Sequence, residues 1–279
     1  MIRAFSPGSI TLFFEIRDEK IDPLRRGSRG VGVCISEGMV TEVSAGDKLE
    51  IYLNRKKIKH SIQEDIAKIY GFSGKIESFT ELPVSQGFGM SAAAALSTAL
   101  ALERINNGTY MHAAQVAHRI EIERRSGLGD VASQYEGGFT VRTREGIQPY
   151  GVVDRIFFPN TPMSIVILDE AIETRRVIGD KDSRRKIKKE GHLAMEKFLR
   201  APSLKNAIKI AREFALNTGL INEEGKNLLQ KCENAAIAMI GNSAVIFGEC
   251  GRDLIEEYPT YIVNLGNRAG ILSSPQSPR

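Results

Sequence analysis

The sequence lacks tryptophan altogether, and its 279 residues include only three cysteines. Cys34, Cys232 and Cys250 are widely spaced, with no Cys-x-x-Cys pair and no metal-binding spacing, so nothing indicates a zinc site. Isolated cysteines of this kind are typical of reduced thiols inside the cell. We therefore expect a cytoplasmic protein whose thiols stay reduced.

Long apolar runs are missing as well. No stretch approaches the roughly 20 apolar residues that a membrane-spanning helix needs, and residues 1–5 lack the apolar core of a signal peptide. The net charge of +4 suits an anionic substrate but does not by itself indicate binding to nucleic acid or membranes. We expect neither kind of partner.

The hydrophobic fraction of 42% is enough to bury a sizeable core, in one large domain or two moderate ones. Two prolines within residues 156–163 mark the boundary that we expect between an N-terminal domain, residues 1–158, and a C-terminal domain, residues 159–272. Residues 273–279 are expected to form a disordered tail. Strand and helix patterns together indicate an α+β fold.

Hydrophobic periodicity predicts the main elements. Residues 2–5 and 10–16 read as two strands joined by a Ser-Pro-Gly-Ser turn. Helices are expected over residues 61–70, 92–102, 110–125, 203–218 and 222–240.

Residues 83–93, Pro-Val-Ser-Gln-Gly-Phe-Gly-Met-Ser-Ala-Ala, form a glycine-rich turn between a predicted strand and a small-residue helix. Gly87 and Gly89 allow backbone conformations closed to other residues and let another group approach closely. The free N–H groups and the dipole at the helix start favour an anion. The Ser91 hydroxyl is placed to cap the helix, contact a phosphate or bind a metal.

This stretch differs from two common nucleotide-binding motifs. It is not a Walker loop, because no Gly-Lys-Ser/Thr follows, and it is not the dinucleotide fingerprint, because the third glycine is missing. A tight turn with a serine cap is the structural alternative.

Residues 22–33 form a loop with three arginines and three glycines that leads into an apolar strand. The planar fork of an arginine matches a carboxylate in two places. Arg25, Ser28 and Arg29 are therefore candidates for a carboxylate or phosphate site, and a solvated basic loop is the alternative.

The helix expected over residues 110–125 places His118 and Glu121 three residues apart, on one face. It leads into a Ser-Gly-Leu-Gly-Asp turn that ends at Asp130, and the next strand carries Arg142. Each residue has an ordinary structural alternative: a satisfied buried histidine, a surface ion pair for the glutamate, and a helix cap for the aspartate.

The glycine-rich stretch resembles the phosphate-binding motif of the GHMP kinases, which act on galactose, homoserine, mevalonate and phosphomevalonate. Their motif reads roughly Pro-x-x-x-Gly-Leu-Gly-Ser-Ser-Ala-Ala; here Phe88 replaces the leucine, Met90 replaces the first serine, and Ser91 is retained. The resemblance implies a two-domain α+β fold, with an N-terminal domain like ribosomal protein S5 and a C-terminal ferredoxin-like α/β sandwich. It also implies ATP and Mg²⁺ as cofactors.

Three blocks extend the resemblance. They are Asp-Pro-Leu-Arg-x-Gly-Ser-Arg-Gly from Asp22, Gln-Gly-Phe-Gly-Met-Ser from Gln86, and Gly-Leu-Gly-Asp from Gly127. Together they are similar to the archaeal pantoate kinases, which phosphorylate the 4-hydroxyl of pantoate on a route to coenzyme A. A carboxylate acceptor would give the arginine loop a purpose. The motifs cover most of residues 1–155.

The resemblance implies a role for each candidate residue. The phosphates of ATP would contact Pro83, Gln86, Gly87, Phe88, Gly89, Met90 and Ser91. Mg²⁺ would be held by Ser91 and Glu121, with Glu123, on another side of the helix, as the alternative ligand. Asp130 would accept the proton of the acceptor hydroxyl or orient it, which makes Asp130, Ser91 and Glu121 the catalytic set. The substrate carboxylate would be bound from the group Arg25, Ser28, Arg29, His118 and Arg142.

One departure from the family is the third motif, where GHMP kinases carry a glycine-rich segment and this chain has only Gly241-Asn242-Ser243. Other functions stay open. The chain could be another GHMP-type enzyme, acting on mevalonate, homoserine or shikimate, or a catalytically inactive regulatory protein. A nucleic-acid binder is suggested only by the basic run at residues 181–189, which lacks interleaved aromatic residues. A homodimer is also open.

Overall fold

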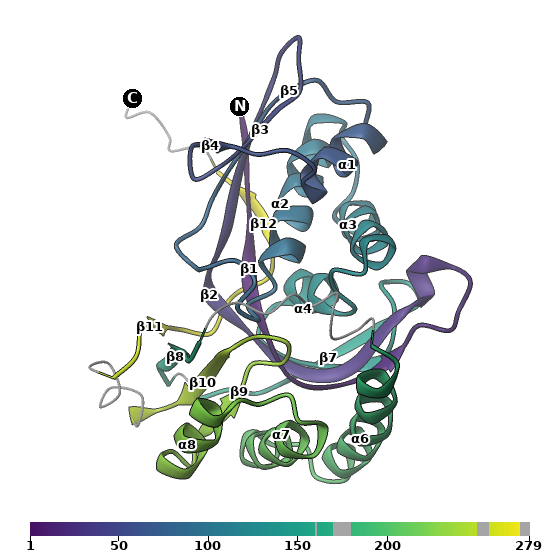
Figure 1. Cartoon of the computed structure of the whole chain (residues 1–279). Helices are drawn as coiled ribbons and strands as arrows, with labels where there is room; N and C mark the ends of the chain where they lie inside the picture. Colours follow the sequence, from purple (N-terminus) through teal and green to yellow (C-terminus); the bar gives the residue numbers. More distant parts are fainter. Residues whose placement is uncertain (160, 170–179, 250–256, 274–279) are drawn as a thin grey trace.

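The computed structural model describes residues 1–159, 161–169, 180–249 and 257–273 (Figure 1). These residues form two β-sheets with helices packed against both. The long strands β1 (Ile2–Arg17) and β2 (Gly27–Ala45) run through the molecule, with one group of helices at one end and a second group at the other. The mixture of sheets and helices confirms the predicted α+β class.

The first sheet is built on β1 and β2. Its other strands are β3 (Glu50–Leu53), β4 (Lys56–Lys57), β5 (Gly74–Phe79), β6 (Phe139–Arg144), β7 (Val152–Ile156) and β12 (Gly270–Leu272). The strand order is β12-β1-β2-β5-β3-β4, and β6 pairs with both β2 and β7. A short 3₁₀ turn, η1 (Pro23–Arg25), lies between β1 and β2.

Strand β1 contains the Ser-Pro-Gly-Ser segment that the sequence predicts to be a turn. The chain stays extended there, and its pairing with β2 shifts register between Pro7 and Gly8. Gly38 of β2 lies opposite Pro7, and a Cβ at Gly38 would lie 2.1 Å from the Ser6 carbonyl oxygen. The predicted turn is therefore wrong, because a glycine in the partner strand leaves room for a proline in a bulged strand.

Four helices accompany the first sheet. They are α1 (Ile62–Ile69), α2 (Met90–Ile105), α3 (Tyr110–Arg124) and α4 (Asp130–Glu136). Helices α2 and α4 pack on its strands, and α1 and α3 pack on α2. Helix α2 is buried along most of its length, and its small side chains let β1, β2 and α3 pack closely around it. The helices predicted over residues 61–70, 92–102 and 110–125 are confirmed, with small differences at their ends.

The second sheet has the order β11-β8-β10-β9. Its strands are β8 (Met163–Ile167), β9 (Ala235–Ile237), β10 (Ser243–Phe247) and β11 (Thr260–Val263). Its helices are α6 (Lys181–Arg200), α7 (Leu204–Thr218) and α8 (Glu223–Lys231). Helices α6 and α7 also pack on β1, where Phe13 meets Phe198 and Phe14 meets Phe214 at ring-centroid distances of 5.8 and 5.9 Å. No described helix is both long enough and apolar enough to cross a membrane.

The helix predicted over residues 222–240 is wrong in its second half. Helix α8 ends at Lys231, where Arg212 of α7 donates hydrogen bonds to the carbonyl oxygens of Leu229 at 2.5 Å and Cys232 at 2.8 Å. These bonds satisfy the open end of the helix. Residues 235–237 are buried and pair with β10, and a short apolar run of this kind does not distinguish a buried strand from a helix.

The thiol prediction is correct at only one of the two described cysteines. Cys34 is free and buried, whereas Cys232 is disulfide-bonded. Distance along the sequence does not limit which cysteines meet in the fold, so the prediction of a reduced Cys232 is wrong. Cys250 lies outside the described residues.

The predicted domain boundary, between residues 158 and 159, falls between the last consecutive strand of the first sheet and β8. Near the end of the chain, β12 returns to pair with β1. The division into residues 1–158 and 159–272 stays a prediction, and residues 274–279 of the predicted tail lie outside the described part.

Candidate active site

A cavity of about 470 Å³ lies where the glycine-rich loop meets the start of α2, the end of α3 and the start of α4. Strands β1, β2 and β6 also contribute to its lining. The polar side chains at the cavity are those of Thr11, Ser28, Ser85, Ser91, Glu121, Ser126, Asp130 and Arg142. Five of these eight, Ser28, Ser91, Glu121, Asp130 and Arg142, are site residues that the sequence singles out.

The glycine-rich loop adopts the conformations that its composition predicts. Ser85, Gly87 and Gly89 have positive φ angles of 66°, 84° and 62°. Gly89 is the N-cap residue of α2, and the first residues of this helix line the cavity. The unbonded N–H groups of a helix start and its dipole therefore act at the cavity, which is suited to an anion.

The turn at Gly241-Asn242-Ser243 supports this loop from behind. Ser243 Oγ donates to the carbonyl oxygen of Gln86 at 2.5 Å. A Cβ at Gly241 would lie 2.3 Å from the same oxygen, and a Cβ at Gly87 would lie 3.2 Å from Gly241 Cα. The shortened third motif thus contacts the loop through one glycine and one hydroxyl group.

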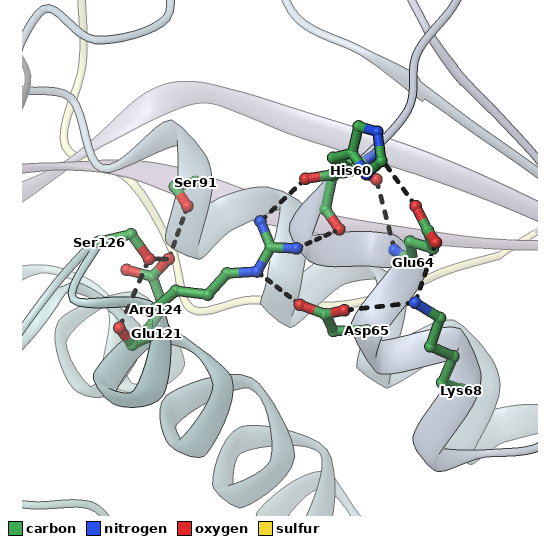
Figure 2. A network of polar contacts seen from close by, with 9 residues as sticks. His60, Glu64, Asp65, Lys68, Ser91, Glu121, Arg124 and Ser126 are labelled. Atoms are coloured by element: carbon green, nitrogen blue, oxygen red, sulfur yellow. Dashed lines mark hydrogen bonds and ion pairs between the residues drawn. The ribbon is translucent and has the colours of Figure 1, made fainter.

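Ser91 of α2 and Glu121 of α3 point toward each other (Figure 2). Ser91 Oγ donates to Glu121 Oε1 at 2.6 Å, and Ser126 Oγ donates to the same oxygen at 2.8 Å. Glu121 is buried, whereas Glu123 is exposed. The fold therefore brings Glu121 to Ser91 and leaves Glu123 at the surface.

Asp130 is the first residue of α4, with Gly129 as the N-cap residue. The carboxyl groups of Asp130 and Glu121 both lie near Gly127. A Cβ at Gly127 would lie 2.1 Å from Glu121 Oε2 and 3.4 Å from Asp130 Oδ2. A Cβ at Gly89 would lie 3.3 Å from Asp130 Cγ. Asp130 thus lies against the start of α2, and its carboxylate and that of Glu121 both border Gly127.

Burial changes the acidity of both carboxyl groups. It raises the pKa of Glu121 to about 7, although the Ser91 and Ser126 hydroxyls favour the ionised form. Burial also raises the pKa of Asp130, and the Arg142 guanidinium is the main opposing influence. Glu121 is buried and Asp130 is half-buried in the same cavity, where the two carboxylates repel each other, so a bound cation would be stabilised between them.

Arg142 of β6 lines the cavity beside Ser28. Its Nη1 donates to Ser133 Oγ at 2.6 Å, while its Nε is buried and has no hydrogen-bond partner among the described residues. A Cβ at Gly129 would lie 2.5 Å from Arg142 Nε and 2.6 Å from Ser28 Oγ. An unpaired guanidinium N–H and a hydroxyl group therefore share one small space, an arrangement suited to a carboxylate.

Two of the predicted substrate-binding arginines do not line the cavity. The Arg25 guanidinium lies 4.3 Å from the centre of the Tyr150 ring. Arg29 Nη1 lies 3.4 Å from Glu15 Oε2 in an ion pair. Both side chains therefore have other partners in this structure.

His118 does not line the cavity either. Its Nε2–H donates to the Arg26 carbonyl oxygen at 2.9 Å, next to the arginine loop. Burial lowers the pKa of His118 to about 4, so the imidazole is neutral at pH 7. This environment fits the structural alternative, in which the histidine holds the loop.

In the predicted phosphate-binding stretch, Gly87 to Ser91 line the cavity, whereas Pro83 and Gln86 do not. The Gln86 side chain instead donates to the Asp169 carbonyl oxygen at 3.1 Å. Sequence reasoning missed the lining residues Thr11, Phe14, Ser126, Leu128, Met239 and Ile240. Ser126 and Leu128 belong to the Ser-Gly-Leu-Gly-Asp turn, and this position is a signal that could have found them. The other four residues reach the cavity only through the fold.

The oxygen donors fit Mg²⁺ bound together with nucleotide phosphates. Mg²⁺ usually takes one or two protein carboxylates and keeps water and substrate phosphates as its other ligands. The Ser91 hydroxyl and the Glu121 carboxylate lie at the cavity beside the glycine-rich loop. In the described part of the chain, no group of three or more His, Cys, Asp or Glu residues could hold a metal ion. Phosphate oxygens would therefore have to complete the coordination.

The family model described as GHMP kinases N terminal domain matches residues 55–138. A pantoate kinase from Thermococcus kodakarensis is 35% identical over 237 residues, which are 80% of this chain and 78% of the relative. A pantoate kinase from Methanocaldococcus jannaschii is 32% identical over 250 residues, 86% of this chain and 90% of the relative.

Among solved structures, one described as a phosphotransferase related to the CoA biosynthesis pathway is 30% identical, with a TM-score of 0.86. The match covers 97% of this chain and 98% of the other chain, so it includes both sheets and extends well beyond the sequence motifs. The expected two-domain GHMP kinase fold is confirmed. The chain belongs to the GHMP kinases and, within them, to the pantoate kinase family.

Proposed function

We propose that this chain is a pantoate kinase, which transfers the γ-phosphoryl group of ATP to the 4-hydroxyl of pantoate in coenzyme A biosynthesis. One observation carries the proposal: a single cavity joins a helix start suited to an anion and the carboxylates of Glu121 and Asp130 to a separate guanidinium–hydroxyl pair. The first group suits phosphoryl transfer, and the second suits the carboxylate of a small acceptor.

The phosphates of ATP would lie against residues 87–91, where Gly87 and Gly89 leave the backbone open to close approach. Phosphoryl transfer depends mainly on in-line placement and on neutralising the charge of the transferred group. The start of α2 contributes to both, because its N–H groups are fixed by a buried helix.

Ser91 and Glu121 are the residues proposed to hold Mg²⁺, which would neutralise phosphate charge when bound. Ser126 donates to the same Glu121 oxygen as Ser91 does, and so it orients the carboxylate. The other carboxylate oxygen, Oε2, lies on the side of Gly127 and Asp130.

Asp130 is the residue proposed to accept the proton of the acceptor hydroxyl. It is packed against Gly89 at the phosphate end of the cavity, and a general base must reach both the hydroxyl and the line of transfer. The nearby Arg142 favours its ionised form, which a base requires.

Ser28 and Arg142 are proposed to bind the acceptor carboxylate. With the carboxylate held at Gly129, the distant hydroxyl of a short hydroxy acid would lie toward Asp130. Arg25, Arg29 and His118 would act indirectly, through the position of the loop that carries Ser28. We also propose the cytoplasm as the location.

The test is a panel of acceptors. ADP release from ATP and Mg²⁺ is measured with pantoate, mevalonate, homoserine and shikimate, and with EDTA present as a control. Turnover with pantoate alone, abolished by EDTA, supports the proposal. Turnover with another acceptor overturns the substrate assignment, and nucleotide binding without any turnover favours an inactive regulatory protein.

A further inference from the structure

Two apolar side chains lie beside the proposed carboxylate site, and the functional assignment above gives them no role. Phe14 of β1, Gly30 of β2 and Arg142 of β6 form one row across the sheet, since Gly30 pairs with both of the others. Residues paired in this way project from the same face. A Cβ at Gly30 would lie 2.7 Å from Arg142 Nη2 and 3.0 Å from Phe14 Cβ, so the two side chains meet above the glycine.

Leu128 lies between the two glycines of the Ser-Gly-Leu-Gly-Asp turn. Gly127, on one side of it, borders the carboxylates of Glu121 and Asp130. Gly129, on the other side, borders Arg142 and Ser28. The Leu128 side chain is half-buried and lines the cavity, as does Phe14. An apolar side chain therefore occupies the wall between the reacting end of the cavity and the carboxylate end.

In pantoate, a carbon with a secondary hydroxyl follows the carboxylate, and a carbon that bears two methyl groups stands between it and the carbon of the primary hydroxyl. If its carboxylate lies at Gly129 and its hydroxyl at Asp130, this dimethyl carbon lies between them, at the level of Leu128. We propose that Leu128, with Phe14 as a second apolar side chain lining the cavity, determines acceptor specificity by packing on the two methyl groups. The inference rests on the proposed function and assigns the hydrocarbon part of the same acceptor.

Other apolar lining residues lie at a different end of the cavity. Val84 belongs to the glycine-rich loop, and Met239 precedes the third-motif turn that supports that loop. Val84 is 47% exposed. Truncating Val84 therefore provides a matched control, because it removes a similar apolar side chain from the proposed phosphate end.

The experiment compares two acceptors, pantoate and 2,4-dihydroxybutanoate, which is pantoate without its two methyl groups. The ratio of their kcat/KM values is measured by ADP release for the wild type, Leu128→Ala, Leu128→Val, Leu128→Met and Val84→Ala. A missing methyl-sized group in an apolar pocket typically changes kcat/KM by roughly 10- to 200-fold. We expect the wild type to prefer pantoate by about 100-fold, and Leu128→Ala to reduce this preference by about 10-fold.

Leu128→Val should shift the preference in the same direction by less, and Leu128→Met should retain it, because methionine has a similar volume. The KM for ATP should stay unchanged in all three Leu128 variants, and Val84→Ala should leave the acceptor ratio unchanged. Leu128 is only half-buried on a turn, and thermal unfolding checks that each variant is folded.

An unchanged ratio in both Leu128→Ala and Leu128→Val, with active wild type, would overturn the inference and leave the proposed function intact. Equal kcat/KM values of the wild type for the two acceptors would also overturn the inference and leave the proposed function intact. Absence of wild-type turnover with pantoate would instead reject the proposed function.

Discussion

At the scale of single residues, Glu121 and Asp130 share one cavity but have different neighbours. Glu121 accepts two serine hydroxyl groups on one oxygen, whereas Asp130 lies beside Arg142 and the start of α2. The hydroxyl donors orient Glu121 without supplying a charge, whereas the positive charge of Arg142 opposes the effect of burial on the pKa of Asp130. The difference favours Glu121 as the cation ligand and Asp130 as the base.

Asp130→Asn should lower kcat by about 10²- to 10⁴-fold, the usual contribution of a general base, because an amide cannot take the proton of the acceptor. The measurement is steady-state ADP release with pantoate, together with thermal unfolding to check the fold. Asp47→Asn, a change at an exposed aspartate, is the control. Near-normal turnover in Asp130→Asn would refute the role of this residue as the base.

His118 makes the stability of the protein depend on pH. Its folded pKa of about 4 lies below the value of about 6.5 expected in the unfolded chain. The unfolded chain therefore binds a proton first as the pH falls, and the contribution of His118 is complete above about pH 6.5 and is lost toward pH 4. Between about pH 7.5 and pH 5 the loss amounts to about 2 kcal/mol.

Glu121 acts in the opposite direction over the same range, because burial raises its pKa to about 7. The test therefore compares the wild type with His118→Gln by urea unfolding at both pH values. The stability of the wild type relative to the variant should fall by about 2 kcal/mol on acidification. A difference that does not change with pH would show that His118 is not buried in its neutral form.

The residues that could be predicted from the sequence share one property: they lie in short motifs whose local conformation places the side chain. Ser91 lies two residues after Gly89, the N-cap of α2, and Asp130 lies directly after Gly129, the N-cap of α4. Arg25 and His118 are different, because their partners, Tyr150 and the Arg26 carbonyl oxygen, come from distant segments or from the backbone. Residue type and spacing carry no signal for such contacts.

At the scale of elements, the end of α3 is tied to the start of α1 (Figure 2). Arg124, three residues after Glu121, donates from Nε to Asp65 Oδ2 at 2.6 Å. Its Nη1 donates to the His60 carbonyl oxygen at 3.0 Å, and its Nη2 donates to that of Ser61 at 2.9 Å. The last turn of a helix is prone to fray, so these bonds hold the turn that carries Glu121.

Arg124→Gln should lower the free energy of unfolding by about 1–2 kcal/mol, because it removes hydrogen bonds from a partly buried, charged donor. It should also lower kcat by about 5-fold, a change in the barrier of about 1 kcal/mol. Urea unfolding and steady-state kinetics measure the two effects. Arg119→Gln, at an exposed arginine of the same helix, is the control, and equal effects from both variants would contradict this account.

Helices were predictable where strong helix formers, or apolar residues at helical spacing, continue over a long segment, as in α2 and α3. The errors arose where the partner strand decides the outcome. Gly38 lets β1 continue through Pro7, and pairing with β10 makes a strand of residues 235–237. The local sequence pattern gives no information about these long-range strand pairings.

At the scale of the whole molecule, the cavity depends on contact between the first sheet's glycine-rich loop and the turn before β10 of the second sheet. Gly241 is the closest point, because its Cα faces the backbone of Gln86 and Gly87. The shortened third motif therefore still supports the glycine-rich loop, because Gly241 has no side chain and leaves room for the loop backbone.

Gly241→Ala should displace the loop, since the new Cβ would lie 2.3 Å from the Gln86 carbonyl oxygen and 2.6 Å from the Gly87 nitrogen. We expect the KM for ATP to rise by about 10-fold or more, equivalent to about 1.4 kcal/mol of lost binding, with a smaller change in the KM for pantoate. Gly270→Ala is the matched control, because no atom lies within 4 Å of its new Cβ. Equal KM values for ATP in the two variants would contradict the proposed support of the loop.

The central claim is that the cavity holds the carboxylate of pantoate at Arg142 and its distant hydroxyl at Asp130. Phosphorus NMR of the product tests this arrangement most directly, because the phosphorus signal splits according to the number of protons on the neighbouring carbon. The account predicts a phosphate ester coupled to two protons, the methylene group of the 4-hydroxyl. Coupling to a single proton would mean transfer to the secondary hydroxyl next to the carboxylate, and would contradict the proposed orientation of the substrate.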